Sequence, residues 1–212
     1  MLEKVWEVEV IDTPRDGSCF FSAIAMALND SIEMWYGIDE LRIPMERYWN
    51  LYHEETSENL TEVTSDLIRY MCSINIDENI LETFNAEAEF RRETEKNDNI
   101  AKFKTPKDLG DHFRKKNTWG DHASFHAFLK SLNFNCAIIV FDAEFGGIRF
   151  LPKEWTKSKK AYICLRFEDN HYGVIRLKEQ KNLCVTRETV IEMIESVKEF
   201  VDADKIMSGD CF

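Results

Sequence analysis

The stretch Cys136-Ala-Ile-Ile-Val-Phe141 restricts the fold more than any other feature, because it is a continuous apolar run. Such a run is typical of a central strand that is buried on both faces. Helical patterns precede it and alternate with other strand-like segments, and no internal repeat or linker requires a second domain. The sequence therefore predicts an α+β fold, in which a small central mixed β-sheet lies between helical lobes.

Hydrophobic periodicity and turn residues predict the elements around this strand. Strands are expected at residues 5–11, 148–150, 161–167 and 172–177. Helices are expected at residues 19–28 and 77–84, after the N-cap Asp121, and over residues 186–204 with Thr189 and Glu192 as a capping box. The charged, Asn-rich residues 91–108 are expected to be the most mobile stretch.

These elements predict one main domain and one appended helix. The domain is expected to span residues 1–185 and to include a polar helical lobe at residues 30–110. Residues 186–212 are expected to form a C-terminal amphipathic helix and tail that pack on the domain.

Composition narrows the function classes. The 212 residues carry 39 acidic and 27 basic side chains, a formal net charge of −12, which argues against a nucleic-acid partner. No apolar run is long enough to span a bilayer, and the charged start does not resemble a signal peptide. The six cysteines form no CxxC pair, which is typical of a reducing compartment. We expect a soluble, monomeric, cytoplasmic protein with no membrane partner.

The segment Asp16-Gly17-Ser18-Cys19 places a cysteine where a turn enters an apolar helix. A thiol in the first helical turn lies at the positive end of the helix dipole, which favours the thiolate. Gly17 leaves the backbone accessible, so the amides of residues 16–19 can form an oxyanion hole. Asp16 can accept hydrogen bonds from nearby amides and hold the loop in shape. Taken alone, this segment is more typical of an ordinary strand–turn–helix junction with a buried thiol than of a catalytic loop.

A nucleophilic thiol needs a base, and His171 is the best candidate among the five histidines. His171 lies at a turn between two predicted strands, late in the chain, as in papain-like cysteine proteases. His53 and His112 lie in polar helical sequence and are expected at the surface. His122 and His126 have the i, i+4 spacing of metal ligands, but no Cys or acid lies at ligand spacing near them, so no metal site is expected.

Three motifs together resemble the ovarian tumour (OTU) family of deubiquitinases. Asp16-Gly17-Ser18-Cys19-Phe20-Phe21 is similar to its cysteine box, and Asn170-His171-Tyr172 is similar to its histidine box. Trp119-Gly120, with the helix and strand that follow, resembles its central block. The order and spacing of the blocks agree with the family over roughly residues 5–178.

The resemblance implies a papain-like fold and a cofactor-free thiol protease that hydrolyses the (iso)peptide bond after the C-terminal glycine of ubiquitin. Cys19 would attack the carbonyl, His171 would carry the proton, and Asp16 would belong to the catalytic loop. The partner would be ubiquitin or polyubiquitin, in the host cytoplasm if the protein comes from a virus or an intracellular bacterium. The residues implied for the substrate channel are Trp119, Gly120, Asn170 and Tyr172.

The sequence departs from the family pattern at Gly173, where many members carry an Asn or Asp that orients the histidine. Asp12, which follows the first predicted strand, is the preferred replacement. Asp169 and Asn170 are weaker candidates, because neighbours in a strand point away from one another.

Three other functions stay open. The same fold could cleave a ubiquitin-like modifier, or it could bind ubiquitin without cleaving it, which Gly173 slightly favours. An endopeptidase that matures its own polyprotein is the third, but the only Gly-Gly pair, Gly146-Gly147, lies between predicted strands.

Overall fold

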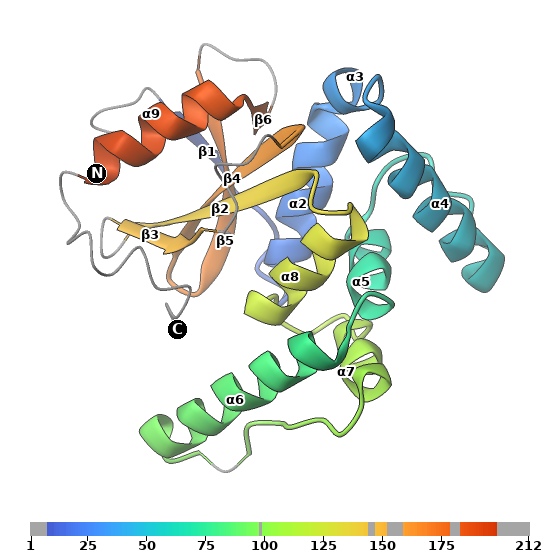
Figure 1. The fold of residues 1–212 in the computed structure, drawn as a ribbon, viewed down its shortest axis with the longest axis vertical. Helices are drawn as coiled ribbons and strands as arrows, with labels where there is room; N and C mark the ends of the chain where they lie inside the picture. The colour runs from blue at the N-terminus through green and yellow to red at the C-terminus, as the bar shows by residue number, and fades with distance from the viewer. Residues whose placement is uncertain (1–7, 98, 144–146, 152–158, 179–182, 199–212) are drawn as a thin grey trace.

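The computed structural model describes residues 8–97, 99–143, 147–151, 159–178 and 183–198, which form eight helices and six strands around one sheet (Figure 1). The strands are β1 (Val8–Ile11), β2 (Cys136–Asp142), β3 (Gly147–Phe150), β4 (Ala161–Glu168), β5 (His171–Leu177) and β6 (Cys184–Val185). The helices are α2 (Cys19–Asp30), α3 (Ile32–Trp35), α4 (Asp39–Thr56), α5 (Ser65–Ser73), α6 (Glu78–Glu95), α7 (Pro106–Phe113), α8 (His122–Ser131) and α9 (Arg187–Lys198).

The sheet is mixed, and β2 lies near its centre. The strand order is β1-β5-β4-β2-β3, with β6 pairing along β4. β2 and β4 run parallel, and the other neighbours are antiparallel. Every residue of β2 is buried, as expected for a strand that is covered on both faces. The predicted α+β class is confirmed.

The two faces of the sheet carry separate cores (Figure 1). One face packs against α2 and α8, with α5 packed behind these two helices, and we call it the lobe face. The other face packs against α9, and we call it the α9 face. Side chains alternate between them along β2, with Ile138 and Val140 on the lobe face and Ala137 and Ile139 on the α9 face.

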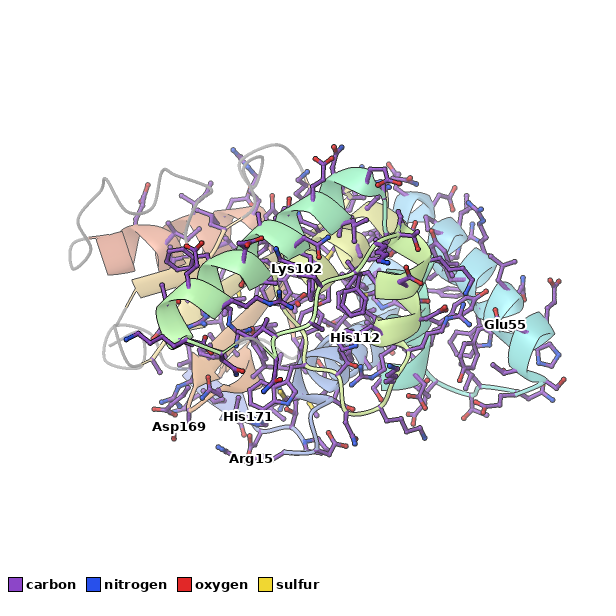
Figure 2. The ribbon with its side chains drawn as sticks, turned by 90° about the horizontal axis from the view of Figure 1, so that it is seen from below. Arg15, Glu55, Lys102, His112, Asp169 and His171 are labelled. Carbon is purple, nitrogen blue, oxygen red and sulfur yellow. The ribbon has the colours of Figure 1, made fainter. Side chains whose placement is uncertain are left out.

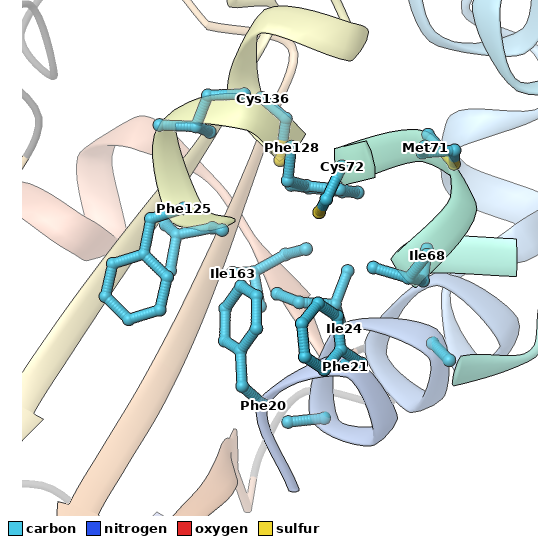
Figure 3. Close-up of a cluster of buried hydrophobic side chains, with 14 of the residues drawn as sticks. Phe20, Phe21, Ile24, Ile68, Met71, Cys72, Phe125, Phe128, Cys136 and Ile163 are labelled. Atoms are coloured by element: carbon cyan, nitrogen blue, oxygen red, sulfur yellow. The ribbon is translucent and has the colours of Figure 1, made fainter. Parts of the chain in front are cut away.

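Aromatic side chains from α2 and α8 fill the lobe face (Figure 3). The Phe20 ring centroid lies 5.1 Å from that of Phe21, 4.6 Å from that of Phe125 and 5.8 Å from that of Tyr172. α5 closes this core from the other side with Ile68, Met71 and Cys72. The Phe20 ring of the cysteine motif therefore packs directly against Tyr172 of the histidine motif.

Several local predictions can now be judged. Asp121 caps α8 as predicted, with its carboxylate accepting the backbone N–H of Ser124 at 3.0 Å. The predicted capping box at Thr189 is wrong, because α9 begins at Arg187 and Thr186 stands at its start, where its hydroxyl accepts the Thr189 N–H at 3.4 Å. Residues 199–204 of that predicted helix lie outside the described residues.

The stretch 91–108 contains more regular structure than predicted. α6 continues to Glu95, and α7 begins at Pro106 behind a capping box made by Thr105 and Asp108. An ion pair between Arg91 and Glu95 supports the last turn of α6. In the part of the chain that the structure describes, no helix is long and apolar enough to cross a membrane.

Candidate active site

Cys19 is the first residue of α2, and its side chain is buried. The N-cap residue Ser18 makes no side-chain cap, because its hydroxyl donates to the carbonyl of Lys116 at 3.0 Å instead. The first intrahelical bond runs from the Ser22 N–H to the Ser18 carbonyl at 2.8 Å. The amides of the first turn are therefore left facing the thiol rather than a capping side chain.

Burial dominates the electrostatics of this thiol and raises the pKa of Cys19 above its usual value. Backbone N–H groups of Tyr172, Phe20 and Cys19 act in the opposite direction. Burial therefore opposes the thiolate that the position at the helix terminus was expected to favour. This direction favours a protonated thiol, which needs a base to react.

The loop before Cys19 is held in shape by its own polar groups. The Asp16 carboxylate accepts the Ser18 N–H at 2.8 Å, and Gly17 has a φ of +82°, a conformation that favours glycine. Asn117 packs where a Gly17 side chain would lie, 3.4 Å from an added Cβ. Since Asp16 occupies the Ser18 amide, that amide does not belong to an oxyanion hole, which corrects the prediction for this position.

His171 is the first residue of β5 and lies directly after a tight turn. Asp169 and Asn170 form that turn with φ values of 51° and 57°, as in a hairpin of the I′ type. Both of these side chains are exposed, whereas His171 is buried. In the view of Figure 2, Arg15, Asp169 and His171 lie at the same edge of the molecule.

Asp12 is the residue that the structure brings to the histidine. Its Oδ1 lies 2.6 Å from His171 Nε2, and this hydrogen bond lowers the pKa of Asp12. A carboxylate can only accept, so Nε2 donates and the lone pair of the neutral ring lies on Nδ1. The Asp12 side chain is 72% exposed, so solvent screens the charge interaction and orientation is its main contribution.

Gly173 explains why the orienting residue comes from β1. β1 and β5 pair with Ile11 opposite Val174, which places Asp12 beside Gly173. A Cβ added at Gly173 would lie 2.8 Å from Val10 Cγ1 and 3.1 Å from the Ile11 carbonyl oxygen. The missing side chain thus lets β1 approach closely enough for Asp12 to reach the imidazole.

Thr13 is a site residue that the sequence did not single out. It is buried, and its hydroxyl donates to the Tyr172 carbonyl at 2.6 Å while lying 3.4 Å from His171 Nε2. Since the hydroxyl proton is used by Tyr172, the oxygen can only share the Nε2–H that Asp12 accepts, as the longer arm of a bifurcated hydrogen bond. Only its position in the turn after the first strand could have drawn attention to it.

A cavity of about 650 Å³ lies between α6 and the body of the protein, and its lining does not include Asp12, Cys19 or His171 themselves. Tyr172 forms part of its wall, and the backbone of Tyr172 also touches the Cys19 thiol. The four residues predicted for a substrate channel all line this cavity: Trp119, Gly120, Asn170 and Tyr172. Trp119 is 57% exposed. The Phe20 ring packs so closely against Gly120 that a side chain at this position would clash with it.

Two of the other histidines, His112 and His122, line the cavity but make no hydrogen bond with Asp12 or His171. His53 is exposed, whereas His112 is half-buried against the Phe103 ring and its pKa is lowered by burial, which corrects its expected surface position. His122 packs on Phe150, and burial lowers its pKa as well. Among the described residues, no group of three or more His, Cys, Asp or Glu side chains is placed to hold a metal ion.

No family model and no curated protein sequence matches the chain. Among solved structures, it is similar to "Structure of Ovarian Tumor (OTU) domain in complex with Ubiquitin", at 18% identity and a TM-score of 0.48, over 90% of this chain and 84% of that one. It is also similar to "Crystal structure of the viral OTU domain protease from Farallon virus", at 18% identity and a TM-score of 0.40, over 85% and 89%.

A third similar structure is "The structure of h/ceOTUB1-ubiquitin aldehyde-UBCH5B~Ub", at 16% identity and a TM-score of 0.49, over 81% of this chain and 78% of that one. These solved structures are OTU domains, the family that the three sequence motifs resemble.

Proposed function

We propose that the protein is a cysteine protease of the deubiquitinase class, with Cys19 as nucleophile and His171 as base. One observation carries the proposal. Asp12 accepts a 2.6 Å hydrogen bond from His171, and the backbone of the next residue, Tyr172, contacts the buried Cys19 thiol. A nucleophile, a base and a residue that orients the base are thus supplied by three separate elements.

The proposed reaction starts from a protonated Cys19 thiol and a neutral His171 ring with its lone pair on Nδ1. Nδ1 of neutral His171 takes the thiol proton as the Cys19 sulfur attacks the substrate carbonyl, and the imidazolium is stabilised by the Asp12 carboxylate. The tetrahedral intermediate collapses to a thioester, and the proton passes from His171 to the leaving amine. Water, activated by the same imidazole, then hydrolyses the thioester and releases the thiol.

The oxyanion needs donors that no other group uses. The Ser18 amide is bonded to Asp16, so we assign the main role to the Cys19 amide at the first position of α2. An amide at this position has no partner within its own helix and adds the positive end of the helix dipole. Losing one such donor typically costs about 10²–10³ in rate.

Ubiquitin is the proposed substrate because three features agree with it. The motifs resemble those of a deubiquitinase family, the exposed Trp119 and the cavity beside Tyr172 provide a surface for an extended tail, and the net charge of −12 favours a basic partner. We place this activity in the cytoplasm. A ubiquitin-like modifier fits the same geometry and is the second candidate.

Intact mass after mixing the protein with ubiquitin that bears a C-terminal alkyne tests the proposal. We expect an increase of one ubiquitin mass in the native protein and in a Cys184→Ala control, and none in Cys19→Ala. Cys184 is a suitable control because it is a buried thiol away from the loop. Labelling that persists in Cys19→Ala would refute the nucleophile, and labelling only by probes of ubiquitin-like modifiers would move the substrate to that class.

A further inference from the structure

Arg69, on α5, is among the most deeply buried side chains of the protein, with 1% of its surface exposed. A buried guanidinium is costly unless it is paired and hydrogen-bonded. Among the described residues no carboxylate forms an ion pair with it, and its Nε has no hydrogen-bond partner. The Asp66 and Asp16 carboxylates act on it only through charge interactions without a direct ion pair, so the buried cation needs a different explanation from an ordinary structural salt bridge.

The partners of Arg69 are backbone carbonyls and one hydroxyl from two distant segments. Its Nη2 donates to the Gly17 carbonyl at 3.2 Å, the Ser18 Oγ at 2.9 Å and the Lys116 carbonyl at 2.8 Å. Its Nη1 donates to the Phe113 carbonyl at 3.1 Å. The guanidinium also stacks on the Phe21 ring, with Cζ 4.0 Å from the centroid.

These contacts fix the peptide group that joins Gly17 to Ser18. Arg69 holds its carbonyl, and the Asp16 carboxylate holds its N–H at 2.8 Å. Both ends of this peptide are therefore occupied, and its plane cannot rotate without breaking a charge-assisted hydrogen bond. The next amide in the chain belongs to Cys19, so the orientation of that peptide sets where the amide and the thiol point.

We propose that Arg69 is a positioning residue for the catalytic loop, which it clamps to the backbone carbonyls of Phe113 and Lys116 so that the Cys19 amide and thiol keep their reactive orientation. The inference rests on the proposed role of Cys19. Two NH₂ groups held in one rigid plane suit this task, because Nη1 reaches the Phe113 carbonyl while Nη2 reaches the loop, whereas a lysine has a single ammonium. Misplacing reacting groups by about 1 Å can cost on the order of 10² in rate.

The test compares Arg69→Lys with Arg114→Lys. Arg114 also contacts α5, by stacking on Tyr70 and donating to Ser73 Oγ at 3.0 Å, but it does not touch the loop. We expect Arg69→Lys to lower kcat for a ubiquitin substrate by about tenfold or more, with KM changed by less than about threefold. Arg114→Lys should keep both constants.

Two further readouts separate a positioning role from loss of structure. Cys72 lies on α5 three residues after Arg69 and is fully buried, so peptide-mapped alkylation of Cys72 reports whether α5 has loosened. We expect Cys72 to stay protected in Arg69→Lys while the alkylation rate of Cys19 changes by about fivefold or more. If Arg69→Lys does not fold, Ser18→Ala removes the shared hydroxyl alone, and we expect its kcat to fall about fivefold.

An unchanged kcat in either variant that folds would overturn the inference, and so would a loss of kcat in which Cys72 becomes labelled together with Cys19. The result is distinguishable from a failure of the proposed function. If the native protein does not cleave ubiquitin, the alkylation pattern decides alone: an altered Cys19 rate with a protected Cys72 supports the clamp, and an unaltered Cys19 rate refutes it.

Discussion

The lobe face and the α9 face of the sheet bury apolar side chains in the same way but differ in the polar groups that accompany them. The α9 face is filled by aliphatic, aromatic and thiol side chains, among them Ile139, Cys164 and Ile194. The helical lobe and its edge also bury Thr13, Arg69 and His171, each with hydrogen-bond partners from distant segments. Polar chemistry is therefore accommodated where several segments converge, and the face that a single helix covers remains apolar.

If this division is correct, a cavity on the α9 face should cost stability and leave activity intact. Ile194 is fully buried in the α9 core, so Ile194→Ala is expected to lower the free energy of unfolding by about 2–5 kcal/mol. We expect kcat at a temperature well below the unfolding transition to be unchanged. Chemical denaturation and steady-state kinetics on the same samples provide the measurement.

Ile24→Ala is the matched change on the lobe face. Ile24 is also fully buried, but it lies on α2, the helix that begins at Cys19. We expect a similar loss of stability together with a lower kcat. Equal effects of the two variants on kcat would show that the faces are not functionally separate.

The polar edge of the lobe face should respond in the opposite way, losing activity but not stability. Asp12→Asn keeps the size of the side chain, but its amide no longer enforces donation by His171 Nε2, so the wrong tautomer becomes populated. We expect kcat to fall about 10- to 100-fold, which is less than the roughly 10²–10⁴-fold of general acid–base catalysis as a whole, because the base itself is kept. Because Asp12 is largely exposed, the unfolding free energy should change by less than about 0.5 kcal/mol.

Asp169→Asn is the control, since Asp169 lies in the adjacent turn with its side chain exposed. Its kcat should equal that of the native protein. If Asp12→Asn were as active as Asp169→Asn, the imidazole would have to be oriented without Asp12, and Thr13 would be the next group to test.

The sequence predicted the elements that local patterns determine. The apolar run of β2, the helix that begins at Cys19 and the Asp121 cap all depend on neighbouring residues or on simple periodicity. The full length of α6 was missed because most of its residues are polar and its apolar stripe is short. The capping of α9 was misplaced by one helical turn, since Thr186 and Thr189 are both suitable residues for the start of a helix.

From local residue patterns alone, contacts of the site were predictable only where one motif contains both partners, and the preference for Asp12 as the partner of His171 came from the family resemblance instead. Asp16 and Ser18 are two residues apart, and their hydrogen bond follows from a local turn. Arg69 lies 52 residues from Gly17, and nothing in its local sequence shows that carbonyls of two other segments will surround it. The contact between Asp12 and His171 spans 159 residues and depends on the register of β1 against β5, which the sequence alone does not specify.

The smallest expected effect concerns the free-energy cost of placing the ionisable Asp121 carboxyl group on the lobe face. Burial raises the pKa of Asp121 from 3.8 to about 7, so between these values the folded protein keeps a proton that the unfolded chain has lost. The contribution of Asp121 to the free energy of unfolding therefore falls as the pH rises from about 4 to about 7, and it stays low at higher pH. Asp121→Asn cannot ionise and retains the cap, because its oxygen can accept the same Ser124 N–H. The full shift corresponds to roughly 4 kcal/mol, but Asp121 is only half-buried, so solvent reduces the effect; we expect the variant to equal the native protein at pH 4 and to be about 1 kcal/mol more stable at pH 7.5, measured by urea unfolding at each pH. A stability difference that is the same at both pH values would show that the pKa of Asp121 does not change on folding. The contrast between the two faces would then rest on hydrogen bonding alone.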